Sequence, residues 1–169
     1  MKKLLRLLLL VCMVLPMASL PAYAEIPTEV HGNFTYEPAC AFPGEALGVN
    51  LFVPCTDTET WTEPLDGTPT TGYVDGTAWT EYWLIWNTRS EVLVFSSQGE
   101  FDGSVLGSDR GIAEVRLTGI SKDGAKQWQG TWLIGQGSGG LEGVHGEGTW
   151  YGPDDEGRFT YDGLVHFDP

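Results

Sequence analysis

No window after residue 24 places apolar residues at the i, i+3, i+4 and i+7 positions of a helix without an interrupting glycine or proline. Glycine alone supplies 23 of the 169 residues, and each glycine inside a helix costs about 1 kcal/mol relative to alanine. The chain consists instead of short extended runs separated by turn residues, which is typical of all-β proteins. This pattern constrains the fold more than any other feature of the sequence.

Residues 1–24 have the composition of a secretory signal peptide. Residues 1–6 are basic, residues 7–15 are apolar but too short to span a bilayer comfortably, and Ala22-Tyr23-Ala24 supplies a cleavage site. An uncleaved membrane anchor is the alternative. We therefore expect a protein that is cleaved near Ala24 and secreted, to the extracellular space or the periplasm, with no membrane anchoring afterwards.

The remaining 145 residues have the length of one domain, 25–169. They hold all 23 acidic residues but only six of the nine basic ones, so their net charge is −17. A surface this acidic repels nucleic acid and anionic lipid, and neither is expected as a partner. The sequence predicts no cofactor and does not indicate the oligomeric state.

Two cysteines lie beyond the leader, Cys40 and Cys55. In an oxidising compartment an isolated pair most often forms a disulfide, and closing a loop of about 15 residues stabilises the fold by roughly 3 kcal/mol. A metal site is the alternative, but the histidines are scattered singly along the chain. We expect the disulfide and no metal.

The chain divides into an irregular part and a regular part. Residues 25–70 contain many prolines, and we expect loops, a first strand at 29–36 and short edge strands at 47–53 and near 60–62. Residues 71–169 predict an antiparallel meander, with strands at 78–87, 91–102, 111–120, 126–134, 141–151 and 158–167. Lys122-Asp123-Gly124 and "GPDDEG" (152–157) are turn signals between strands. We predict a single meander that closes into a roughly eight-stranded β-barrel, with a two-sheet β-sandwich as the alternative.

Gly135-Gln136-Gly137-Ser138-Gly139-Gly140 matches the G-x-G-x-x-G pattern of dinucleotide-binding loops. That function requires a helix to open at the end of the loop, and the following "LEGVHGEGTWYG" has too many glycines for a helix. We interpret residues 137–140 as a turn and residues 141–151 as a strand. Glycines within such a strand indicate sharp curvature, or a large aromatic side chain lying flat across it.

Three segments resemble a known family: "GEFDGSVLGSDRG" (99–111), "WQGTWLIGQGSGGLEGVHGEGTWYG" (128–152) and "GRFTYDGLVHFD" (157–168). Together they are similar to the allene-oxide-cyclase-like barrels, in particular to small uncharacterised bacterial domains of that type. The resemblance covers about the last 95 residues. It implies an eight-stranded antiparallel barrel with an apolar cavity, in which some relatives bind or cyclise small hydrophobic molecules.

These observations predict a secreted barrel that holds a small apolar molecule. The alternatives are a cyclase- or isomerase-like enzyme that uses the same cavity, and an extracellular module that binds carbohydrate or protein. His145 and Glu147, two residues apart on one strand face, are the candidate catalytic groups. Aromatic and charged residues within predicted strands are the candidate ligand-binding groups: Trp83, Glu100, Arg116, Trp132 and Trp150.

Overall fold

The computed structural model describes residues 26–65, 67, 70 and 72–168, so the predicted signal peptide lies outside the described residues. The described chain forms nine strands: β1 (Thr28–Cys40), β2 (Glu45–Leu47), β3 (Asn50–Thr62), β4 (Val74–Asn87), β5 (Val92–Val105), β6 (Gly111–Ser121), β7 (Trp128–Gly139), β8 (Val144–Gly152) and β9 (Phe159–Phe167). In this part of the chain, no helix is long and apolar enough to cross a membrane.

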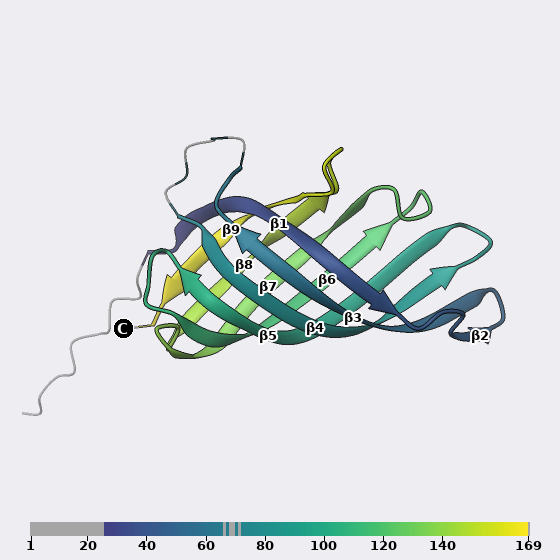
Figure 1. The fold of residues 1–169 in the computed structure, drawn as a ribbon, viewed down its shortest axis with the longest axis horizontal. Coiled ribbons are helices and arrows are strands. Elements are labelled where there is room, and N and C mark those ends of the chain that lie inside the picture. Colours follow the sequence, from purple (N-terminus) through teal and green to yellow (C-terminus); the bar gives the residue numbers. More distant parts are fainter. Residues whose placement is uncertain (1–25, 66, 68–69, 71, 169) are drawn as a thin grey trace, which may run out of the picture.

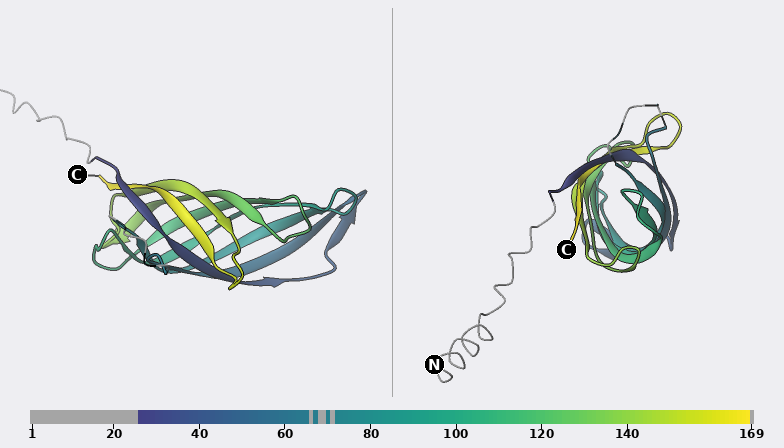
Figure 2. Two further views of the ribbon diagram at one scale, coloured as in Figure 1. Left: turned by 90° about the horizontal axis from the view of Figure 1, so that it is seen from above. Right: turned by 90° about the vertical axis from the view of Figure 1, so that its left-hand side faces the viewer.

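All nine strands belong to one antiparallel sheet in the order β1-β9-β8-β7-β6-β5-β4-β3-β2 (Figure 1). β1 also pairs with β3, from Asn33–Thr62 to Cys40–Cys55, and this pairing joins eight strands into a hydrogen-bonded ring. Viewed end-on, the strands surround a closed, barrel-like interior (Figure 2). The predicted meander and its closure are confirmed, and β2 is a short addition at the β3 edge of the meander.

Alternation along each strand separates the inside of the ring from the outside. In β3 the odd-numbered residues from Val53 to Trp61 are buried, and the residues between them are more exposed. The even-numbered residues of β4 and β7 and the odd-numbered residues of β5 and β6 point inward in the same way. This period of two places one side chain in every pair inside the ring.

The interior has two different ends. At one end, which we call the closed end, buried aliphatic side chains pack into the hydrophobic core: Val30, Val74, Val105, Leu141, Val144 and Val165. A layer of aromatic rings follows, in which Trp61 contacts both Trp132 and Tyr161. The opposite end, where β1 ends and β3 begins, is the pocket end described below.

Glycines on the inner surface make room for two tryptophans. A Cβ atom added at Gly148 or Gly163 would lie within 2.5 Å of the Trp132 indole, at 2.5 and 2.3 Å respectively. A Cβ atom added at Gly130 would lie 2.7 Å from the Trp150 indole. The glycine-rich segment is therefore a strand with aromatic rings packed against it, as the sequence predicts.

The structure corrects two expectations about element boundaries. Residues 25–70 are not mainly loops, because β1 and β3 are 13-residue strands of the ring. Pro38 and Pro54 are tolerated because each lies where its strand has only one paired neighbour. The turn expected at 137–140 is also displaced: β7 continues to Gly139 and the turn occupies 140–143, where Gly143 has a φ of 75°.

Candidate functional site

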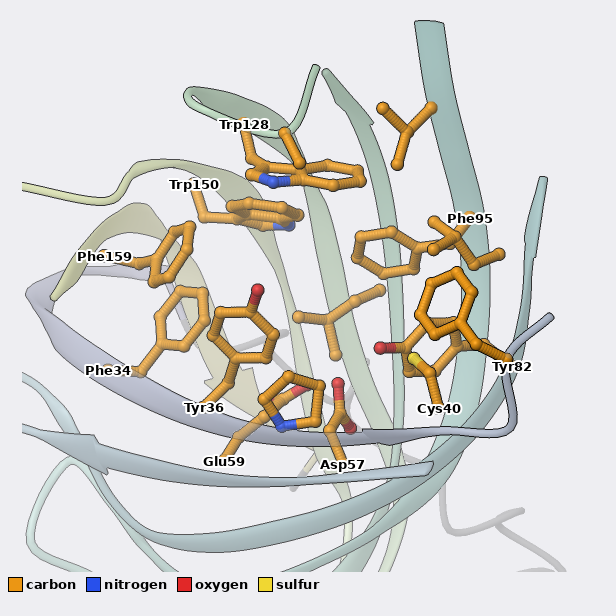
Figure 3. Close-up of a pocket in the computed structure, with 16 residues that line it drawn as sticks. Phe34, Tyr36, Cys40, Asp57, Glu59, Tyr82, Phe95, Trp128, Trp150 and Phe159 are labelled. Atoms are coloured by element: carbon orange, nitrogen blue, oxygen red, sulfur yellow. The ribbon is translucent and has the colours of Figure 1, made fainter. Parts of the chain in front are cut away.

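A cavity of about 200 Å³ occupies the pocket end of the ring (Figure 3). Eight aromatic side chains dominate its wall, and among the described residues the only Asp, Glu, Lys, Arg or His side chains that line it are those of two acids. The lining residues are Phe34, Tyr36, Pro38, Cys40, Phe42, Asp57, Glu59, Tyr82, Leu84, Leu93, Phe95, Leu117, Ala125, Trp128, Trp150 and Phe159, with Phe42 and Ala125 exposed at the rim. A small, mainly apolar cavity with a few polar groups is the usual form of a small-molecule site.

The two carboxyl groups belong to Asp57 and Glu59, which follow each other on the inner face of β3. Asp57 is 6% exposed and Glu59 is 2% exposed. The Thr80 hydroxyl donates a hydrogen bond to Asp57 Oδ1, and Trp61 Nε1 donates to Glu59 Oε2 at 2.9 Å. Both acids are thus held by neutral donors rather than by cations.

Burial favours the protonated form of both acids. Desolvation raises the pKa of Asp57 to about 6, although the hydrogen bond from Thr80 opposes this shift. Desolvation, with the nearby Asp57 charge as a second cause, raises the pKa of Glu59 to about 8. Near neutral pH, Asp57 is therefore mainly ionised and Glu59 mainly protonated.

Two phenol groups complete the polar part of the pocket. Tyr36 pairs across the β1–β3 seam with Glu59, and Tyr82 pairs with Cys55 on the other side of β3. Both hydroxyl groups point into the cavity, that of Tyr36 towards Trp150 and that of Tyr82 towards the side where Asp57 lies (Figure 3). Burial, followed by the charge of Asp57, raises the pKa of each phenol, so both remain protonated.

The rest of the wall is built from packed rings. Phe34 stacks on Phe159 with centroids 5.1 Å apart, and Phe95 stacks on Trp150 at 6.0 Å. Trp128 packs against Phe95 at 5.6 Å. The Trp150 indole is fixed further by a hydrogen bond from Nε1 to the Thr131 carbonyl at 3.2 Å. These contacts hold the rings in place and leave the cavity between them.

The predicted disulfide between Cys40 and Cys55 is present. The two residues form the last pair of the β1–β3 seam, with Cα atoms 4.2 Å apart, and Cys40 lines the cavity. The bond therefore fastens the closing seam of the ring at the pocket end.

The structure brings only one of the five candidate ligand-binding residues to the pocket, Trp150. Trp132 is buried in the core nearer the closed end, and its Nε1 donates to the Asp162 carbonyl. Trp83, Glu100 and Arg116 lie on the outer face of the ring. Arg116 is paired there with Glu114 of its own strand, at 2.6 Å between Nη2 and Oε1.

The candidate catalytic residues His145 and Glu147 also lie on the outer face of β8, away from the pocket. His145 Nε2 is 3.0 Å from Asp168 Oδ2, and its ring stacks on that of His166. Because residues two apart in a strand share a face, the sequence correctly placed the two residues on one face. It did not reveal that this face points outward.

The acid pair was missed at the level of sequence, although "VPCTDTETW" (53–61) carries a signal for it. Strict alternation puts Asp57 and Glu59 on the same face as Val53, Cys55 and Trp61, and an acid in register with such residues is expected to be buried. Pro54 obscured the pattern because it interrupted the predicted strand. Among the described residues, no group of three or more His, Cys, Asp and Glu side chains is placed to hold a metal ion.

Comparison with known proteins informs the fold alone. No family model matches the chain, and no curated protein is significantly similar to it in sequence. A solved structure from Shewanella oneidensis, a protein of unknown function from the DUF3224 family, is similar with a TM-score of 0.64. The alignment covers 85% of this chain and 99% of that one, at 16% sequence identity. The chain thus resembles a small bacterial β-rich domain.

Proposed function

We propose that this protein binds a small, mainly apolar molecule in the pocket end of its ring. The observation that carries the proposal is the cavity itself, which is lined by eight aromatic rings beside two buried carboxyl groups. An engineered apolar cavity of about 150 Å³ accommodates benzene. A cavity of about 200 Å³ accordingly suits a ligand with one ring, or a branched aliphatic group of similar size.

We further propose that the protein is secreted and is related to the allene-oxide-cyclase-like barrels. A disulfide is compatible with an oxidising compartment, and the leader has signal-peptide composition. The glycine-rich motifs of residues 99–168 support the proposed relationship. The proposal that the ligand is a small hydrophobic molecule, as in some members of that family, belongs to this proposed relationship.

Native mass spectrometry of protein purified without denaturation tests ligand binding. We expect a bound small molecule that is lost on Leu84→Phe, because Leu84 lines the cavity and a larger side chain would fill it. Ile112→Phe, on the exposed outer face, is the matched control and should retain the molecule. Equal retention by both variants would place the ligand elsewhere, and a wild-type protein that binds no one-ring compound in solution would refute the proposal.

A cyclase- or isomerase-like activity is the second candidate, and the acid pair favours it. An ionised Asp57 beside a protonated Glu59 offers a proton acceptor and a proton donor within one apolar cavity. An isomerisation needs only that one proton be removed from carbon and one be returned. Incubation of the bound molecule with protein in D₂O should place deuterium on carbon with the wild type and not with Asp57→Asn. Absence of exchange with the wild type would leave binding as the function.

A further inference from the structure

The charge inside the pocket has no counter-ion among the described residues. Asp57 and Glu59 line the cavity, whereas no lysine, arginine or histidine does. Their hydrogen-bond partners, Thr80 and Trp61, are neutral. A buried carboxylate is costly unless it is paired, so its environment favours a ligand that brings positive charge.

The walls around the acids are also suited to a cation. Tyr36, Tyr82, Phe95, Trp128 and Trp150 surround the cavity with ring faces and phenol oxygens (Figure 3). An aromatic face attracts an ammonium group, and cages of such rings recognise alkylated ammonium ions. An anionic ligand would meet acidic groups and ring faces without a basic side chain.

Two acids at neighbouring inward positions of one strand favour a ligand with a single positive charge. Burial raises the pKa of both groups, so the pair carries fewer than two negative charges near pH 7. The other titratable groups that face Asp57 are Tyr36 on β1 and Tyr82 on β4, and both are neutral at this pH. The chain as a whole carries a net charge of −14, which attracts cations from solution.

We propose that the pocket selects organic monocations, namely substituted ammonium compounds whose apolar part is about the size of one aromatic ring. This inference rests on the proposed function, because it names the ligand class of the same pocket. Equal binding of a neutral molecule of the same shape is the competing outcome of the test.

The test compares two probes of nearly identical shape, phenyltrimethylammonium and tert-butylbenzene, which differ in charge. Binding is followed by tryptophan fluorescence, since Trp128 and Trp150 line the cavity. We expect the cation to bind at least about tenfold more tightly than its neutral counterpart at pH 7.5. Asp57→Asn should remove most of this preference. Glu100→Gln, which removes one negative charge from the outer face, should preserve it.

The pH dependence of wild-type binding gives a second reading that does not require a variant to fold. The charge of phenyltrimethylammonium does not titrate, so its affinity should rise as Asp57 ionises between pH 5 and pH 7.5. The affinity of tert-butylbenzene should not rise over this range.

The outcomes separate the two proposals. Equal binding of both probes, with no increase in cation affinity across that pH range, would overturn cation selection and leave the apolar pocket intact. Binding of neither probe would overturn both. Stronger binding of the cation that survives in Asp57→Asn and is lost in Glu100→Gln would move the cation site to the outer surface.

Discussion

The two ends of the ring are built by the same strands but have different contents. At the closed end, inward residues such as Val74 and Val105 are short aliphatics that are buried within one hydrophobic cluster. At the pocket end, inward residues of the same strands are large rings and acids, such as Tyr82 on β4 and Phe95 on β5. At the pocket end the rings are fixed by stacked, tilted and T-shaped contacts with one another, and a cavity remains between them. The comparison shows a buried aliphatic core at one end of the ring and the candidate site at the other.

The largest expected difference between the ends concerns their tryptophans. Trp132→Ala should destabilise the fold by about 3–5 kcal/mol, because its indole is fully packed over Gly148 and Gly163. Trp128→Ala, at the half-buried rim of the cavity, should cost roughly half as much and should weaken ligand binding. Chemical denaturation of both variants checks this, and a greater loss of stability for Trp128→Ala would reverse the assignment of the two ends.

Removal of the disulfide should loosen the pocket end selectively. The double variant Cys40→Ser/Cys55→Ser should lose about 3 kcal/mol of stability. Amide hydrogen exchange should accelerate most along the β1–β3 seam near Tyr36 and Asp57, and least at the closed end near Val165. Uniform acceleration over the ring would show that the seam is not a separate weak point.

Stability should fall as pH rises, through the acids of the pocket end. The folded protein binds a proton on Glu59 more tightly than the unfolded chain does, so this stabilisation is complete below about pH 4 and is lost as pH passes about 8. Between pH 5 and pH 8 we expect Glu59 to contribute a loss of about 3–4 kcal/mol. Glu59→Gln keeps an acceptor for Trp61 and should flatten this dependence. Denaturation at several pH values measures it, with Glu100→Gln as the control, and equal slopes in the two variants would contradict the assignment.

The smallest effects are expected on the outer face. His145→Ala and Glu147→Gln should each change stability by less than about 0.5 kcal/mol and leave ligand binding unchanged. Binding titrations of both variants check this. A large loss of affinity in either one would move the site from the interior to the surface of β8.

The sequence predicted the architecture well because that information is local. Alternation and turn signals predicted the strands of the regular meander, and the glycine runs indicated the close approach of aromatic rings. Its closure was predicted from the number of strands and from the removal of exposed edges that closure brings. The disulfide followed from the cysteine count. The length of β3 could not be predicted with the same rules, because Pro54 is acceptable only where the neighbouring strand β1 has already ended, which is a tertiary fact.

The site was far less predictable, for a reason that is also physical. Strand alternation puts His145 and Glu147 on one face of β8, and Asp57 and Glu59 on one face of β3. It does not say which face points into the closed ring: the β3 face points inward and the β8 face outward. That choice depends on the packing of all eight strands. In the sequence, Trp83 and Trp150 are equally good candidates for a ligand-binding residue. In the structure, Trp83 is 55% exposed on the outer face and Trp150 lines the pocket.

The tryptophan indole N–H signals in a two-dimensional ¹H–¹⁵N spectrum test the central claim most directly. The chain has seven tryptophans, distributed over the core, the pocket and the outer face. Titration with phenyltrimethylammonium and with tert-butylbenzene should shift the signals of Trp128 and Trp150 and leave those of Trp79 and Trp83 in place. Shifts confined to Trp79 and Trp83, with Trp128 and Trp150 unchanged, would contradict a binding site inside the ring.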